Sequence, residues 1–365
     1  MRYLEPGTDG PAKDDWSTGL ILEEMRGGSL ALGVVAVLTA AGAVACWLLP
    51  SSPGTVSAGV VLALVALLGG LGTLVSWVET RSERSGLLDG PWRRVPVELL
   101  DAPGGTGWLR ADGLVLKGWF EDYASVLLER GEAFLCGPDA DGRAVLRFAG
   151  FARMEHVKVD RSGKSAAFPV RPREERPLGR PLDHPATARA FKGLRRGARA
   201  WLLAVVPAGV GALVILLSFF PLAPAGLVVG GLVLVPALLA VPALLEISRW
   251  HRDAVLAVEG SARWTPVPTT LLPWEAGDHV AGLAEMPGGL ALVQFVLPEL
   301  SVIANIADTG VMWIAGTHDD VIAVGVPRVP VLTFAAVQPD RDTPKEDPIP
   351  WIQRFTQPDF SGLPR

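Results

Sequence analysis

Two long blocks without a single charged residue dominate the pattern of hydrophobic and polar positions. The first covers residues 29–78 and the second covers residues 201–245. A proline-containing turn interrupts each block near its middle. Because a helix needs about 20 apolar residues to cross a bilayer, the pattern predicts four membrane spans, arranged as two hairpins. The expected spans are 29–49, 56–78, 201–220 and 225–245.

The distribution of charge predicts how these spans would be oriented. Both turns lack charge, and all Lys and Arg residues lie in the N-terminal arm, the middle segment or the C-terminal segment. The positive-inside rule then places those segments in the cytoplasm. The sequence therefore predicts a multi-pass protein of the bacterial inner membrane with both termini cytoplasmic.

The water-facing segments read as short strands separated by turn residues. Asp141-Gly142, between two alternating runs, is typical of a hairpin turn. The expected strands are 94–100, 113–117, 124–128, 132–137 and 143–148, then 263–269, 289–295, 300–306, 311–315, 321–326 and 331–335. The predicted fold class is an α+β membrane protein with four transmembrane helices in two hairpins, each hairpin followed by a small antiparallel, barrel-like β module.

The predicted domain boundaries follow from these patterns. In chain order they are a cytoplasmic arm (1–28), hairpin 1 (29–78), β module 1 (79–158), a basic linker (159–200), hairpin 2 (201–245), β module 2 (246–337) and a proline-rich tail (338–365).

The two halves also resemble each other, which predicts an internal duplication. Residues 92–100 resemble residues 264–272 at an offset of 172, and residues 131–137 resemble residues 310–316 at an offset of 179. Chance similarity between two apolar, strand-rich segments is the alternative.

The composition indicates which partners the protein could bind and which cellular compartment it suits. The net charge of -5 and the pI of about 5.6 argue against a global attraction to nucleic acid. The two cysteines, Cys46 and Cys136, exclude a disulfide framework and fit a reducing compartment. The excess of Arg over Lys and the single asparagine, Asn305, resemble a chain from a GC-rich bacterial genome.

No catalytic or metal-binding motif appears in the sequence. The nearest approach to a metal cluster is His318-Asp319-Asp320, which lies between two expected strands and reads as a hairpin tip. The sequence contains no HExxH, no CxxC and no phosphate-binding loop. We therefore expect neither an enzyme nor a cofactor or metal site.

The strongest local signal is electrostatic. Between Lys158 and Arg199 twelve basic residues stand against four acidic ones. The candidate contact for anionic lipid head groups or an acidic protein partner consists of Arg189, Lys192, Arg195, Arg196 and Arg199. A topology signal for the third span is the alternative interpretation.

A second candidate contact lies in the tail, where Trp351, Ile352 and Phe355 form a short apolar motif. This motif could dock on the protein's own surface, at the membrane interface or on a partner.

Together these features predict a non-enzymatic scaffold or regulatory subunit. Its expected partners are the bilayer and another protein or a second copy of the chain, with no nucleic acid. The alternative is a small transport or channel component. It rests on Pro207, Pro236 and Pro242, which could kink the second hairpin.

Overall fold

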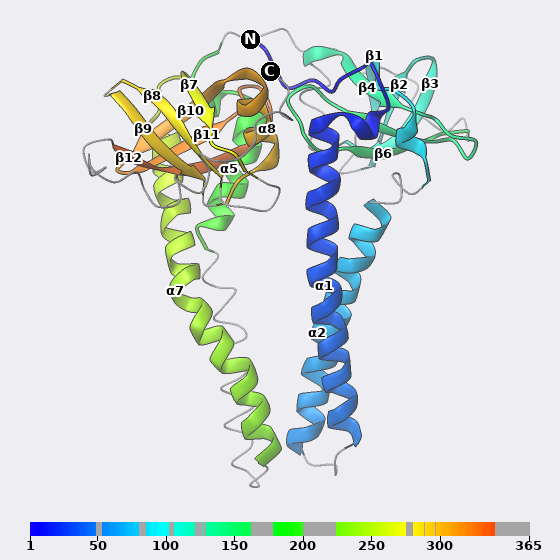
Figure 1. Ribbon diagram of the computed structural model, residues 1–365, viewed down its shortest axis with the longest axis vertical. Coiled ribbons are helices and arrows are strands. Elements are labelled where there is room, and N and C mark those ends of the chain that lie inside the picture. The colour runs from blue at the N-terminus through cyan, green and yellow to red at the C-terminus, as the bar shows by residue number, and fades with distance from the viewer. Residues whose placement is uncertain are drawn as a thin grey trace. The chain divides into compact units, whose positions relative to one another are not determined.

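A computed structural model of the chain (Figure 1) describes residues 1–48, 53–79, 85–101, 106–120, 126, 129–161, 178–199, 224–274, 280–287, 289–295 and 297–339. The chain divides into two compact units. The first holds Met1–Asp9 and two β-barrels, and the second holds most of the long helices.

Helix α1 (Trp16–Leu48) and helix α2 (Pro53–Glu79) pack along each other as a hairpin (Figure 1). Two glycines allow the close approach. A Cβ atom at Gly59 would lie 2.5 Å from Nε1 of Trp47, and one at Gly42 would lie 3.1 Å from Leu62. Helix α7 (Pro224–Gly260) is the third long helix.

The prediction of four transmembrane helices is wrong. Across the residues that the structure describes, no helix combines the length and apolar character that crossing a membrane requires. Two of the helices also extend well beyond the uncharged blocks. Helix α1 begins with charged turns containing Glu23 and Arg26, and α7 continues past its block through Glu246 and Arg249. This finding contradicts the predicted fold class, with its two membrane hairpins, and the predicted multi-pass location in the inner membrane.

The β modules are closed six-stranded antiparallel barrels (Figure 1). The first contains β1 (Arg93–Asp101), β2 (Thr106–Ala111), β3 (Leu114–Trp119), β4 (Glu132–Cys136), β5 (Arg143–Arg147) and β6 (Glu155–Val159). The second contains β7 (Thr265–Leu271), β8 (Val280–Met286), β9 (Gly289–Phe295), β10 (Val311–His318), β11 (Val321–Gly325) and β12 (Leu332–Pro339). Closure leaves no strand edge available for pairing with other chains.

Both barrels have the same strand order. It runs β1-β2-β3-β6-β5-β4 in the first barrel and β7-β8-β9-β12-β11-β10 in the second. Equivalent backbone bonds recur as well. The N–H of Val97 donates to the carbonyl of Gly131 at 2.7 Å, and the N–H of Thr269 donates to that of Gly310 at 2.9 Å. The two donors are 172 residues apart and the two acceptors are 179 residues apart. These are the same offsets that relate the similar sequence segments of the two halves. A duplication would account for this correspondence, and it stays an inference.

One expected strand is helical instead, and the one described residue of another is helical too. Residues 300–306 belong to helix α8 (Leu300–Thr309), and Val126 is helical within the expected strand 124–128. Leu300 to Ile306 are all buried, and a short, mainly apolar run does not distinguish a buried strand from a buried helix. Gly310 ends α8 in the left-handed conformation, with a φ of 68°.

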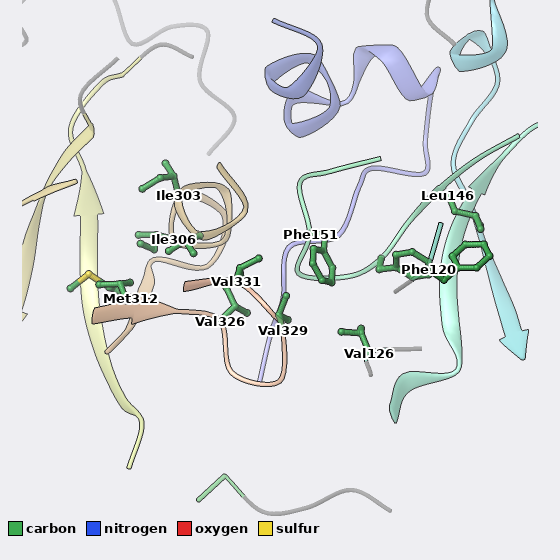
Figure 2. Close-up of a cluster of buried hydrophobic side chains, with 14 of the residues drawn as sticks. Phe120, Val126, Leu146, Phe151, Ile303, Ile306, Met312, Val326, Val329 and Val331 are labelled. Atoms are coloured by element: carbon green, nitrogen blue, oxygen red, sulfur yellow. The ribbon is translucent and has the colours of Figure 1, made fainter. Parts of the chain in front are cut away.

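The N-terminal segment and helix α8 join the two barrels within the first unit. Asn305 on α8 accepts a hydrogen bond from the N–H of Leu4 (2.9 Å) and donates to the carbonyl of Gly150 in the loop between β5 and β6 (2.8 Å). Nearby, the side chains of Phe151 and Val329 belong to one buried apolar cluster that includes residues of both barrels (Figure 2).

Candidate functional site: the basic face of helix α5

Helix α5 (Pro185–Gly197) carries most of the basic cluster expected from the sequence. Proline is favoured at the first helical position because its missing N–H would have no partner there and its φ already suits a helix. One side of the helix is buried through Ala186, Thr187, Phe191 and Leu194. The helix is therefore amphipathic, and its apolar side fixes which residues face solvent.

The opposite side of α5 is a basic face, which we define as Arg189, Lys192, Arg195, Arg196 and Arg199. All five residues are exposed, and Arg199 lies in the turn just after the helix. Four of them are spaced three, four and three residues apart. At about 100° per residue, this spacing keeps them on one side of the helix. The structure thus brings together all five residues that the sequence singled out.

The start of α5 is held by a histidine and a carboxylate. His184 Nδ1 accepts the N–H of Ala186 at 3.3 Å, so in the neutral ring the proton lies on Nε2. Nε2 then donates to the two carboxylate oxygens of Glu129 at 2.8 and 3.1 Å. Only 12 % of the His184 side chain and 10 % of the Glu129 side chain are exposed. This pair attaches the first turn of α5 to the first barrel.

The segment before α5 is also attached, through Arg180. Its guanidinium donates to the carbonyl oxygens of Ser261 (3.3 Å) and Glu259 (3.2 Å), where α7 ends. The last carbonyls of a helix have no partner within the helix, so Arg180 satisfies groups that would otherwise need water. The short 3₁₀ helix Pro181–Asp183 connects Arg180 to His184.

Arg130 lies next to Glu129 and is largely buried. Its guanidinium stacks on the ring of Tyr3, 3.5 Å from the ring centre, and donates to the carbonyl of Ala149. Burial lowers the pKa of Arg130, and proximity to Arg328 adds to this effect, whereas Tyr3 and Glu129 act in the opposite direction. Its Nη2 atom has no hydrogen-bond partner among the described residues.

The last turn of α5 packs closely against α7. A Cβ atom at Gly197 would lie 2.1 Å from Cδ2 of His251, so only glycine fits without movement of that ring. His251 Nδ1 lies 2.8 Å from the carbonyl oxygen of Ile247, which orients the ring. Both ends of α5 are thus fixed, and the basic face is presented on a supported helix.

The other expected sites gain no support from the structure. Trp351, Ile352 and Phe355 lie outside the described residues. His318 ends β10 at an exposed turn, 3.8 Å from Asp319. Across the described residues no group of His, Cys, Asp and Glu side chains could hold a metal ion.

Sequence reasoning missed the residues that position the basic face, namely Glu129, Arg180 and His184. No spacing in the sequence relates Glu129 to His184, because the barrel fold brings them together although they are 55 positions apart.

The basic face can form several simultaneous ion pairs with carboxylates or phosphates.

No family model, no curated protein and no solved structure matches this chain.

Proposed function

We propose that the protein is a non-enzymatic scaffold or regulatory subunit that binds an acidic segment of another protein through the basic face of α5. One observation carries the proposal: five exposed cations share one side of a helix whose other side is buried and whose two ends are fixed.

The arrangement favours binding because the helix is ordered before a partner arrives. Neighbouring cations three and four residues apart repel each other and destabilise a helix by about 0.2–0.5 kcal/mol per pair. An acidic partner would remove that repulsion. Attachment at His184 and Gly197 would keep the helix in place when the partner dissociates.

The alternative of a small transport or channel component stays an untested prediction. No observation on the described residues favours it.

The proposal can be tested by titrating the full-length protein with a fluorescent acidic peptide of about ten glutamates at several salt concentrations. The double variant Lys192→Gln/Arg196→Gln should bind the peptide about 2- to 30-fold more weakly, since each exposed ion pair contributes about 0.2–1 kcal/mol. Lys13→Gln/Arg153→Gln removes the same charge from exposed residues elsewhere and should bind as the unaltered protein does.

Two results would overturn the proposal. One is an equal loss of peptide affinity in both double variants, which would mean that only net charge matters. The other is retention on anionic lipid vesicles through the basic face without any peptide binding, which would assign this surface to lipid head groups.

A further inference from the structure

A second basic surface lies on the outside of the first barrel. Lys117 on β3 is directly opposite Lys158 on β6, and Lys158 is directly opposite Arg143 on β5. Neighbouring strands are about 4.8 Å apart, so three cations form a short row across the barrel wall. We call Lys117, Lys158 and Arg143 the cation row.

The cation row lowers the stability of the fold. Like charges placed directly opposite on neighbouring strands destabilise a sheet. Arg143 is offset by Asp141, 3.1 Å away, but no described carboxylate forms an ion pair with either lysine of the row. An anionic ligand would relieve this repulsion.

Two tryptophans accompany the cation row. Trp108 on β2 is opposite Lys117, whose Nζ lies 5.4 Å from the centre of the indole ring. The indole N–H of Trp108 donates to Asp160 at 2.9 Å, which fixes the ring. Trp119 lies two residues beyond Lys117 on the same face of β3 and is 55 % exposed. An exposed indole beside cations offers a flat apolar surface that a simple anion does not require.

The second barrel lacks this combination. Strands β8, β9, β12 and β11, which occupy the equivalent positions, contain neither Lys nor Arg. The cation row and its tryptophans are therefore not needed to build this type of barrel.

We propose that this face of the first barrel binds single-stranded nucleic acid. The cation row would meet backbone phosphates, and Trp119 would stack on a base. Bases offer their flat faces to a protein ring when they are unpaired, which favours a single strand over a duplex. An acidic peptide would account for the cations but not for the exposed indole. The protein's overall charge of -5 does not prevent such binding, because salt limits electrostatic interactions to about 10 Å.

The proposal is independent of the function proposed for α5 and can be tested separately. A labelled oligothymidylate of about 12 nucleotides is titrated with the full-length protein, and anisotropy is followed at several salt concentrations. Three phosphate contacts predict a log–log salt slope of about -2. Lys117→Gln should reduce that slope by about 0.7, and Trp119→Ala should weaken binding about 5- to 150-fold.

Three further variants make the result specific. Trp119→Phe keeps an aromatic ring and should retain most of the affinity. Leu290→Ala removes a 49 % exposed apolar side chain from β9 and should not change binding. Lys13→Gln should not change binding either, because that exposed lysine belongs to neither the cation row nor the basic face of α5.

The proposal is overturned if the oligonucleotide does not bind at about 50 mM salt, or if Leu290→Ala and Lys13→Gln weaken binding as much as the barrel variants do. It is also overturned if the acidic peptide competes at the same face and loses the same factor in Trp119→Ala. That result would assign the surface to a protein partner.

Discussion

Asn305 offers the sharpest test of how the first unit is held together. Its side chain is 5 % exposed and makes three hydrogen bonds: from the N–H of Leu4 (2.9 Å), to the carbonyl of Gly150 (2.8 Å) and to the carbonyl of Ser301 (2.6 Å). Asn305→Ala removes all three. The Leu4 N–H and the Gly150 carbonyl would then lose the partner that bridges them.

The expected loss of stability follows from these groups. A buried donor or acceptor left without a partner costs about 1–3 kcal/mol. Leu4 is 0 % exposed, so water does not reach its N–H without movement of the chain. Two such groups predict a loss of about 2–6 kcal/mol, which is a large part of the roughly 5–15 kcal/mol that stabilises a typical domain.

Hydrogen exchange and denaturant titration measure this effect at two levels. Peptides covering residues 1–9 and 148–154 should lose protection in Asn305→Ala, and the unfolding midpoint should fall. Ser301→Ala removes one bond, which the N–H of Ala152 donates to the hydroxyl at 3.2 Å, and should cost about 1–3 kcal/mol. Asp308→Ala, in the same helix, removes only the Arg2 ion pair at 3.6 Å and should cost less than about 1 kcal/mol.

Wild-type protection of residues 1–9 in Asn305→Ala, with an unchanged midpoint, would refute the reasoning. It would show that the N-terminal segment is held by its other contacts, and that the three bonds contribute no net stability.

Two further substitutions test close packing and buried polarity. A Cβ atom at Gly316 would lie 1.9 Å from the carbonyl oxygen of Ala257. Gly316→Ala should therefore lower the free energy of unfolding, measured by heat or urea, by at least about 2 kcal/mol. Gly260→Ala is the control and should be nearly neutral, because a Cβ atom there would have nothing within 4 Å. Equal unfolding midpoints for these two variants would contradict the steric argument. The buried hydroxyl of Thr187 has no hydrogen-bond partner among the described residues, so Thr187→Val should raise stability by about 1 kcal/mol, and a lower midpoint would show that the hydroxyl is satisfied after all.

The strands could be predicted where alternation and turn residues were both present. Residues 289–295 match β9, and 132–137 and 143–148 match β4 and β5 to within a residue. Strands β2, β6 and β8 were missed. The register of closure was not predictable either, because it depends on pairing between strands far apart in the sequence.

The helices were harder to predict for a different reason. Apolar runs indicate burial, but they do not say what covers the buried side chains. The run 300–306 became α8, because its side chains fill space at the barrels rather than alternate between a core and solvent. The long uncharged blocks likewise did not predict where α1 begins, at Trp16, or where α7 ends, at Gly260.

The residues of the basic face were predictable, but their support was not. Charge is visible in a sequence, and a spacing of three and four places cations on one side of a helix. The hydrogen bonds between His184 and Glu129 depend on the fold of the first barrel, so no local sequence pattern predicts them. The same holds for the cation row, whose members come from three strands and meet only through the barrel's register.

The two barrels share a strand order, so their differences are more informative than their likeness. Equivalent turns follow β5 and β11, where the N–H of Phe151 donates to the carbonyl of Phe148, and the N–H of Val329 to that of Val326, both at 3.0 Å. Gly150 occupies the left-handed position of the first turn, with a φ of 87°, and a Cβ atom there would lie 3.0 Å from Val329 of the second. The position equivalent to Gly150 in the second turn is an arginine.

The two turns therefore differ at a point where the barrels are in contact. The cation row and the exposed Trp119 occur on one barrel only, so the shared strand order does not require this surface. Transferring that surface tests the argument. Lysines at the outward-facing, equivalent positions of β9 and β12 should leave the second barrel folded and, with a tryptophan beside them, should create a second oligonucleotide site. Failure of that barrel to fold would show that its apolar exterior is required for stability.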